Sequence, residues 1–215
     1  MHIDHLVWYG ADLAESRRYF ATYLDAEPLY GGAHPGEGTA NAVLSLGPTT
    51  YLEILGRDVN QDAACLDAEV ASLDGQGLYH WAVGGVDLTA LAARASAAGL
   101  TCGALVPGGR VKPDGTRLDW LCWGLSGHGF GALVPFFIDW RQSEHPARST
   151  PRGGNLVGLE VHTPNPEGLS RIFSELGLSL PVIESAEPRV QARLGSTHGE
   201  LLLSSIAPLP RGYVI

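Results

Sequence analysis

Two histidines and one carboxylate lie in apolar, strand-like segments of this sequence. His5 and His80 are each followed by an Asp-Leu pair that starts a helical pattern, at Asp12 and at Asp87. Glu53 lies in the apolar segment TTYLEILG, where burial of an unpaired carboxylate is costly. Imidazole and carboxylate groups together bind first-row divalent metals and leave coordination positions open. If these three side chains share one cavity, they predict a site for Fe, Mn, Ni, Co or Zn.

A duplication in the chain indicates how the two histidines could meet. Residues 3–13 (IDHLVWYGADL) and residues 78–88 (LYHWAVGGVDL) align with His5 on His80. Side chains two positions apart share one face of a strand, so each histidine has apolar neighbours on its own face. Two such units related by a pseudo-twofold axis would bring both histidines into one cavity. An ordinary hydrogen-bonded core histidine is the alternative at each position.

The element pattern predicts an α+β fold built from repeated units. Paired βαβββ modules would form a cup-shaped mixed sheet, followed by a third, shorter βαβ-type module. The predicted boundaries are a first module at 1–57, a connector at 58–77, a second module at 78–141, a linker at 142–154 and a third module at 155–215. Glycine-rich stretches at 31–41 and 108–117 predict loops, the first with at most an edge strand. The segment at 132–140 predicts the last strand of the second module.

These segments resemble the vicinal oxygen chelate superfamily of glyoxalases, bleomycin-resistance proteins and extradiol dioxygenases, and within it the glyoxalase-like domain proteins. The resemblance covers about residues 1–141 and is carried by GGAHPGEGTANAVLSLGPTTYLEIL, LYHWAV, GGRVKPDGTRLDW and LVPFFIDW. It implies four metal-ligand positions on four strands, of which His5, Glu53 and His80 match three. The fourth, a glutamate in the family, falls near Leu133, Val134 or Phe136, none of which can bind a metal.

Several other residues are candidates for binding a ligand in the cup. His34 and Asn41 lie in or next to the first glycine-rich loop, and Arg110 lies in the second. A guanidinium binds a carboxylate bidentately, so Arg110 could hold an anionic group of a substrate. Trp81 and Phe136 are the aromatic residues that we expect to line the cup, with ordinary core packing as the alternative.

Composition narrows the class of partner. The formal net charge is −9 and Lys112 is the single lysine, which argues against nucleic acid and against an anionic membrane surface. Three cysteines without a CxxC pattern predict free thiols in a reducing cytoplasm. The third module is expected to bury a sheet face or to form a homodimer interface.

Two functions follow from these observations. The first is a metal-dependent enzyme, of lyase, isomerase or dioxygenase type, acting on a small molecule with vicinal oxygens. The alternative is a metal-free small-molecule or drug-binding protein of the bleomycin-resistance type. The absence of a fourth carboxylate argues against glyoxalase activity on a glutathione hemithioacetal, because that carboxylate is the usual proton-shuttling base.

Overall fold

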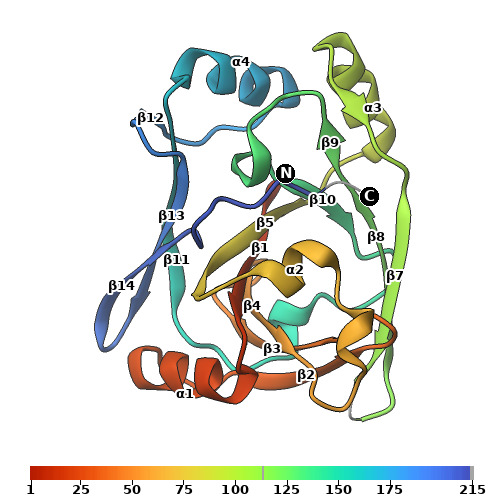
Figure 1. The fold of residues 1–215 in the computed structure, drawn as a ribbon, viewed down its shortest axis with the longest axis vertical. Coiled ribbons are helices and arrows are strands. Elements are labelled where there is room, and N and C mark those ends of the chain that lie inside the picture. The colour runs from red at the N-terminus through yellow and green to blue at the C-terminus, as the bar shows by residue number, and fades with distance from the viewer. Residues whose placement is uncertain (113, 214–215) are drawn as a thin grey trace.

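A curved eight-stranded sheet forms the centre of the computed structural model, which describes residues 1–112 and 114–213 (Figure 1). Its strand order is β2-β3-β4-β1-β5-β10-β8-β7. The strands of the first half are β1 (His2–Gly10), β2 (Leu29–His34), β3 (Thr39–Ser45) and β4 (Tyr51–Arg57). Those of the second half are β5 (Gln76–Gly84), β7 (Val106–Val111), β8 (Arg117–Trp123) and β10 (Phe136–Asp139).

The two halves of this sheet are related by the predicted duplication. Strands β1 and β5 pair antiparallel at the centre, and each has its own module's last strand beside it in parallel, β4 and β10 respectively. The outer strands then follow in antiparallel order on both sides. The predicted α+β class with paired modules around a cup-shaped sheet is therefore confirmed.

The helices begin where the sequence predicts. Asp12 caps α1 (Leu13–Tyr23) by accepting a hydrogen bond from the backbone N–H of Glu15, and Asp87 caps α3 (Leu88–Ala97) in the same way. In the connector a 3₁₀ turn (Ala63–Cys65) precedes the short helix α2 (Ala68–Ser72). No helix in the described part of the chain combines the length and the apolar character needed to cross a membrane.

The third module has a sheet of its own, with strand order β12-β11-β13-β14. Its elements are β11 (Asn155–Thr163), α4 (Pro166–Leu176), β12 (Val182–Glu184), β13 (Arg189–Ser196) and β14 (Gly199–Ser204). Helix α4 lies beside α3 in Figure 1. Phe173 of α4, Phe20 of α1 and Trp81 of β5 belong to one continuous hydrophobic core, so this module packs on the sheet face opposite the cup.

Two local predictions are wrong. Residues 106–111 form strand β7 rather than a loop, and their glycines have a packing role, since a Cβ on Gly108 would clash with the indole of Trp120. Residues 29–34 form an edge strand of the sheet, as the sequence allowed, and a tight turn separates it from β3 at 39–45. The strand expected at 132–140 is shorter, because residues 131–133 form a 3₁₀ turn before β10. The second module also has an additional pair, β6 (Thr101–Cys102) with β9 (Leu125–Ser126).

Candidate functional site

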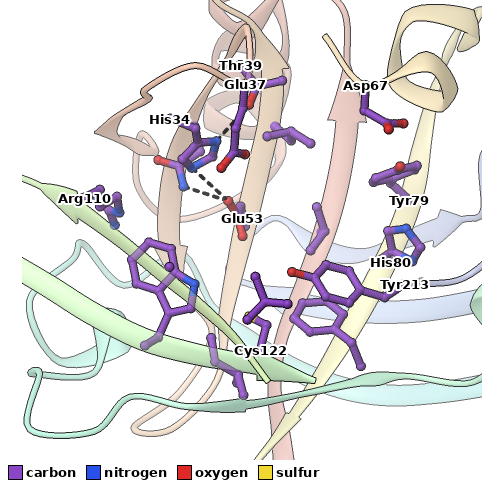
Figure 2. A pocket seen from close by; sticks show the side chains of 18 of the residues that line it. His34, Glu37, Thr39, Glu53, Asp67, Tyr79, His80, Arg110, Cys122 and Tyr213 are labelled. Carbon is purple, nitrogen blue, oxygen red and sulfur yellow. Dashed lines mark hydrogen bonds and ion pairs between the residues drawn. The ribbon is translucent and has the colours of Figure 1, made fainter. Parts of the chain in front are cut away.

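A cavity of about 620 Å³ opens on the concave face of the eight-stranded sheet. Each of the eight strands contributes residues to its lining, with His34 as the contribution of β2. Residues of α2 and residues 212–213 also line it. Its lining combines aromatic groups with a few ionisable ones (Figure 2). Such a cavity is of a size that suits a small organic molecule.

His5 and Glu53 meet at the floor of this cavity. In the parallel pairing of β1 with β4, Val7 lies opposite Glu53, so His5 and Glu53 project from the same face. His5 Nε2 is 3.7 Å from Glu53 Oε2. Asn41 Nδ2 donates a hydrogen bond of 2.7 Å to the other carboxylate oxygen, and His34 Nε2 lies 3.9 Å from that oxygen. Glu53 is therefore held with one oxygen directed at His5.

A β-bulge places Asp4 next to His5. Ile3 lies opposite Val83 and His5 opposite Ala82, so Asp4 is an extra residue in β1. Its carboxylate is 2.8 Å from His5 Nδ1. Proton donation from Nδ1 to this carboxylate leaves a lone pair on His5 Nε2, which faces the cavity.

Two more donors hold Asp4 in place. His145 Nε2 is 3.1 Å from Asp4 Oδ2, and the indole N–H of Trp140 donates to both carboxylate oxygens. Burial raises the pKa of Asp4, but the hydrogen bonds from His145 and His5 outweigh it and hold this pKa well below its ordinary value. Asp4 is thus a carboxylate that fixes the tautomer of His5.

His80 does not join the His5–Glu53 pair. His80 lies on β5 opposite Val7 of the neighbouring strand β1. Val7 in turn lies opposite Glu53 of β4, so it separates His80 from Glu53. Phe136 packs edge-on against both imidazoles, with ring centroids 5.4 Å from His5 and 6.4 Å from His80. Figure 2 shows His80 beside Tyr79 and Tyr213, away from Glu53.

The position of the missing fourth ligand is now defined. Phe136 lies opposite Ala82 in the parallel pairing of β10 with β5, as Glu53 lies opposite Val7 in the first module. Phe136 therefore occupies the position equivalent to Glu53. In the described chain, His5, Glu53 and His80 are not a group whose ligand atoms all lie within 4.8 Å of one another. The three-ligand metal centre predicted from the sequence does not fit this arrangement.

His80 is expected to stay neutral throughout the physiological pH range. Burial lowers its pKa to about 3, from 6.5. Between these two values the unfolded chain binds a proton that the folded protein excludes, so this residue makes the protein less stable as the pH falls from 6.5 towards 3. Imidazole NMR should show no titration of His80 between pH 5 and pH 8. In urea unfolding, His80→Asn should lose less stability than the wild type between pH 7 and pH 5, and an equal loss would contradict the prediction.

Arg110 is a buried cation at the cavity wall. Arg110 is 5% exposed, and its guanidinium donates to the backbone carbonyl of Gly31, which joins β7 to β2 where the two edges of the sheet approach each other. Within residues 1–112 and 114–213, no carboxylate lies within 4.0 Å of it, as the ion pairs formed there do not include Arg110. Burial of an unpaired charge is costly, so the site is suited to an anion.

The remaining predicted ligand-binding residues divide into two groups. His34, Asn41 and Phe136 line the cavity. Trp81 does not, because its side chain points to the opposite face of the sheet, where it is 1% exposed and donates to the carbonyl of Ala132. Trp81 follows His80 directly, so strand alternation alone would have placed it on the other face.

Other residues of the site were not predicted. Tyr79 lines the cavity and Asp4 contacts His5 because each lies at a β-bulge, which reverses the alternation expected for a strand. Tyr213 stacks on Phe136 with ring centroids 4.4 Å apart. No local sequence pattern indicates that residues near the C-terminus return to the cup. The Asp4-His5 dipeptide was the one available signal, since a carboxylate next to a histidine can fix its tautomer.

The paired modules and the cup define the vicinal oxygen chelate class of protein. A family model described as "Glyoxalase-like domain" matches residues 3–177. The chain therefore belongs to the glyoxalase-like family of this superfamily, as the sequence motifs predicted. No curated protein matches the chain in sequence.

Three solved structures are similar to this chain at low sequence identity, and the first two, with TM-scores above 0.5, share its fold. A hypothetical protein from Staphylococcus aureus is 14% identical with a TM-score of 0.67, and the match covers 95% of this chain and 88% of that one. A variant of 4-hydroxymandelate synthase from Streptomyces coelicolor is 17% identical with a TM-score of 0.53, covering 95% and 62%. A variant of methylmalonyl-CoA epimerase from the same organism, in complex with 2-nitronate-propionyl-CoA, is 19% identical with a TM-score of 0.48, covering 68% and 99%.

Proposed function

We propose that this protein is an enzyme that moves a proton next to a carbonyl group in a small organic anion with vicinal oxygens, a reaction of the isomerase or lyase type. The observation that carries the proposal is the His5–Glu53 pair, two proton-exchanging groups 3.7 Å apart at the floor of the cavity. General acid–base catalysis needs such groups within reach of adjacent atoms of one substrate. Because Phe136 and His80 leave no three-ligand centre, no metal enters the proposed steps.

Each residue of the pair has a distinct role in this reaction. Glu53 takes the proton from the carbon next to the carbonyl, using the oxygen that Asn41 does not hold. His5 accepts the proton of the neighbouring hydroxyl group at Nε2, the nitrogen that Asp4 leaves free, and returns it to the carbonyl oxygen. Returning the proton to the other carbon completes an isomerisation, and loss of a neighbouring leaving group completes an elimination.

The unpaired cation in the cavity wall supports an anionic group on the substrate, although four carboxylates also line the cavity. Arg110 faces it as a buried cation, and the aromatic side chains of Trp120, Trp140 and Phe136 supply apolar surface beside it. A carboxylate or similar group of the substrate would pair with the guanidinium and place the reacting carbon over the floor of the cup.

The decisive experiment is hydrogen–deuterium exchange on carbon. The protein is incubated in D₂O with a panel of small 2-oxo and 2-hydroxy carboxylates, and ¹H NMR follows the proton next to the carbonyl. Enzyme-dependent exchange into at least one compound is expected. Stabilisation against heat by one or more of these compounds, with exchange into none of them, would contradict the proposal.

Arg110→Met should weaken substrate binding more than it slows the chemistry. It removes the cation while keeping a long apolar side chain, and loss of a charge-assisted hydrogen bond costs about 1.5–3 kcal/mol. We expect KM for the exchanging compound to rise about 10- to 100-fold with kcat changed far less. Arg117→Met, at an exposed arginine of β8 paired with Asp119, is the matched control. Equal kinetics for Arg110→Met and the wild type would exclude the anion site.

A second candidate function is sequestration of a small molecule without chemistry. It is favoured by the aromatic stacking of Tyr213 on Phe136, which leaves His80 neutral and enclosed by rings. Ligand-induced stabilisation combined with an absence of exchange for every tested compound would identify this function.

A further inference from the structure

A second cluster of ionisable side chains lies at the start of β1, outside the residues that line the cavity. His2, Asp4 and His145 each offer one ligand atom, and these atoms all lie within 4.8 Å of one another. Asp4 Oδ2 is 3.1 Å from His145 Nε2 and 3.8 Å from His2 Nε2. We propose that these three residues form a binding site for a divalent metal ion of the zinc type.

His2 supplies the strongest indication of a missing partner. Its Nε2 atom is shielded from solvent and has no hydrogen-bond partner in the described chain, although it faces the Asp4 carboxylate. A buried polar atom without a partner is energetically unfavourable. An ion between His2 and Asp4 would supply the absent interaction.

A hydrogen bond from the backbone of Ala147 orients the His145 imidazole towards the Asp4 carboxylate. His145 precedes the 3₁₀ turn Pro146–Arg148, and its Nδ1 accepts a hydrogen bond from the backbone N–H of Ala147. This leaves Nε2 as the atom that faces Asp4, where a metal ion would replace its proton. The imidazole is thus held for coordination without help from the ion.

Two glycines make room for the cluster. A Cβ on Gly84 would clash with Asp4 Oδ2, and a Cβ on Gly85 would lie 2.9 Å from His2 Nδ1. Gly85 also has a φ of +67°, which disfavours other residues there. The end of β5 therefore approaches the cluster closely because it carries no side chains at these positions.

The donor set determines the class of metal. Two imidazoles and one carboxylate suit Zn²⁺ and neighbouring first-row ions, whereas Mg²⁺ and Ca²⁺ prefer oxygen ligands alone. The His2 side chain is 35% exposed, so the cluster lies near the protein surface although the Nε2 atom itself is shielded. Oδ2 of Asp4 would then bind the ion while Oδ1 of Asp4 stays hydrogen-bonded to His5. The ion would therefore hold the carboxylate that orients His5 more rigidly.

Zinc titration of the metal-stripped protein, prepared without a histidine tag, tests the site. Isothermal titration calorimetry should show one Zn²⁺ per chain for the wild type, and Zn²⁺ but not Mg²⁺ should raise Tm. His2→Ala and His145→Ala should each weaken Zn²⁺ binding by at least about ten-fold, since even outer-sphere changes cost about 10–100-fold. His2→Ala is the safer variant for folding, because the His2 imidazole makes no hydrogen bond in the described chain.

Controls separate this site from the cup. His198→Ala, at an exposed turn, and Glu53→Gln, at the cavity floor, should bind Zn²⁺ like the wild type. The absence of saturable Zn²⁺ binding by the wild type would overturn the proposal. So would binding that Glu53→Gln removes and His2→Ala leaves within about two-fold. Neither result would bear on the proton transfer proposed for the His5–Glu53 pair, which the exchange assay tests by itself.

Discussion

Glu53→Gln is expected to slow the exchange reaction about 10²- to 10⁴-fold, the range by which a positioned general base contributes. Glutamine keeps the size of the side chain and can still accept the hydrogen bond from Asn41, but it cannot take a proton. Ligand affinity, measured by calorimetry, should change by less than about three-fold because Arg110 and the aromatic lining remain. The variant would therefore lose kcat rather than KM.

The matched control for this variant is Glu37→Gln. Glu37 also lines the cavity, but it is an exposed residue in the turn between β2 and β3. Its replacement should leave kcat within about two-fold of the wild type. Comparable losses for both variants would mean that the overall negative charge of the cavity matters rather than the base at its floor. An active Glu53→Gln enzyme would exclude the proposed mechanism.

How much of this site the sequence predicts depends on strand alternation. The i, i+2 rule correctly places His5 and Glu53 on one face, because β4 and the relevant part of β1 are regular. It fails for Asp4 and Tyr79, since each bulge adds one residue that no composition rule marks. The alternation of side chains therefore could not predict that Asp4 fixes the tautomer of His5.

The separation of His80 from Glu53 has a different cause. The duplication correctly predicts that His5 and His80 lie on neighbouring central strands of one sheet. Whether two side chains on one face touch depends on the groups between them, and here the ring of Phe136 lies against both histidines. The sequence indicated that this position lacked a metal ligand, but only the packing shows that an aromatic ring there contacts both histidines while Val7 lies between His80 and Glu53.

The fold itself was largely predictable, with errors at glycines. Repeated strand–helix units and Asp caps predicted the paired modules, because periodicity and capping are local properties. Gly108 and Gly109 suggested a loop, although they lie in β7. At Gly108 the absence of a side chain admits the Trp120 indole, a contact between strands that sequence alone does not reveal.

Phe173→Ala should lower the free energy of unfolding by about 3–5 kcal/mol, the usual cost of removing a buried aromatic ring. Phe173 of α4 is 2% exposed and packs edge-on against Trp81 with ring centroids 6.2 Å apart. Trp81 is held by its hydrogen bond to the Ala132 carbonyl, so it cannot move freely to fill the space. Denaturant unfolding, with a slope like that of the wild type, measures the loss.

The same experiment tests whether the third module and the cup form one folding unit. Trp81 follows His80 on β5, so the Phe173–Trp81 contact joins α4 directly to the strand that lines the cavity. Leu202→Ala, at a position of β14 that is 57% exposed, is the control and should cost less than about 1 kcal/mol. If the modules share one core, Phe173→Ala shifts a single transition. If instead two separate transitions appear, with only the first one shifted, the third module unfolds independently and cannot support the geometry of the cup.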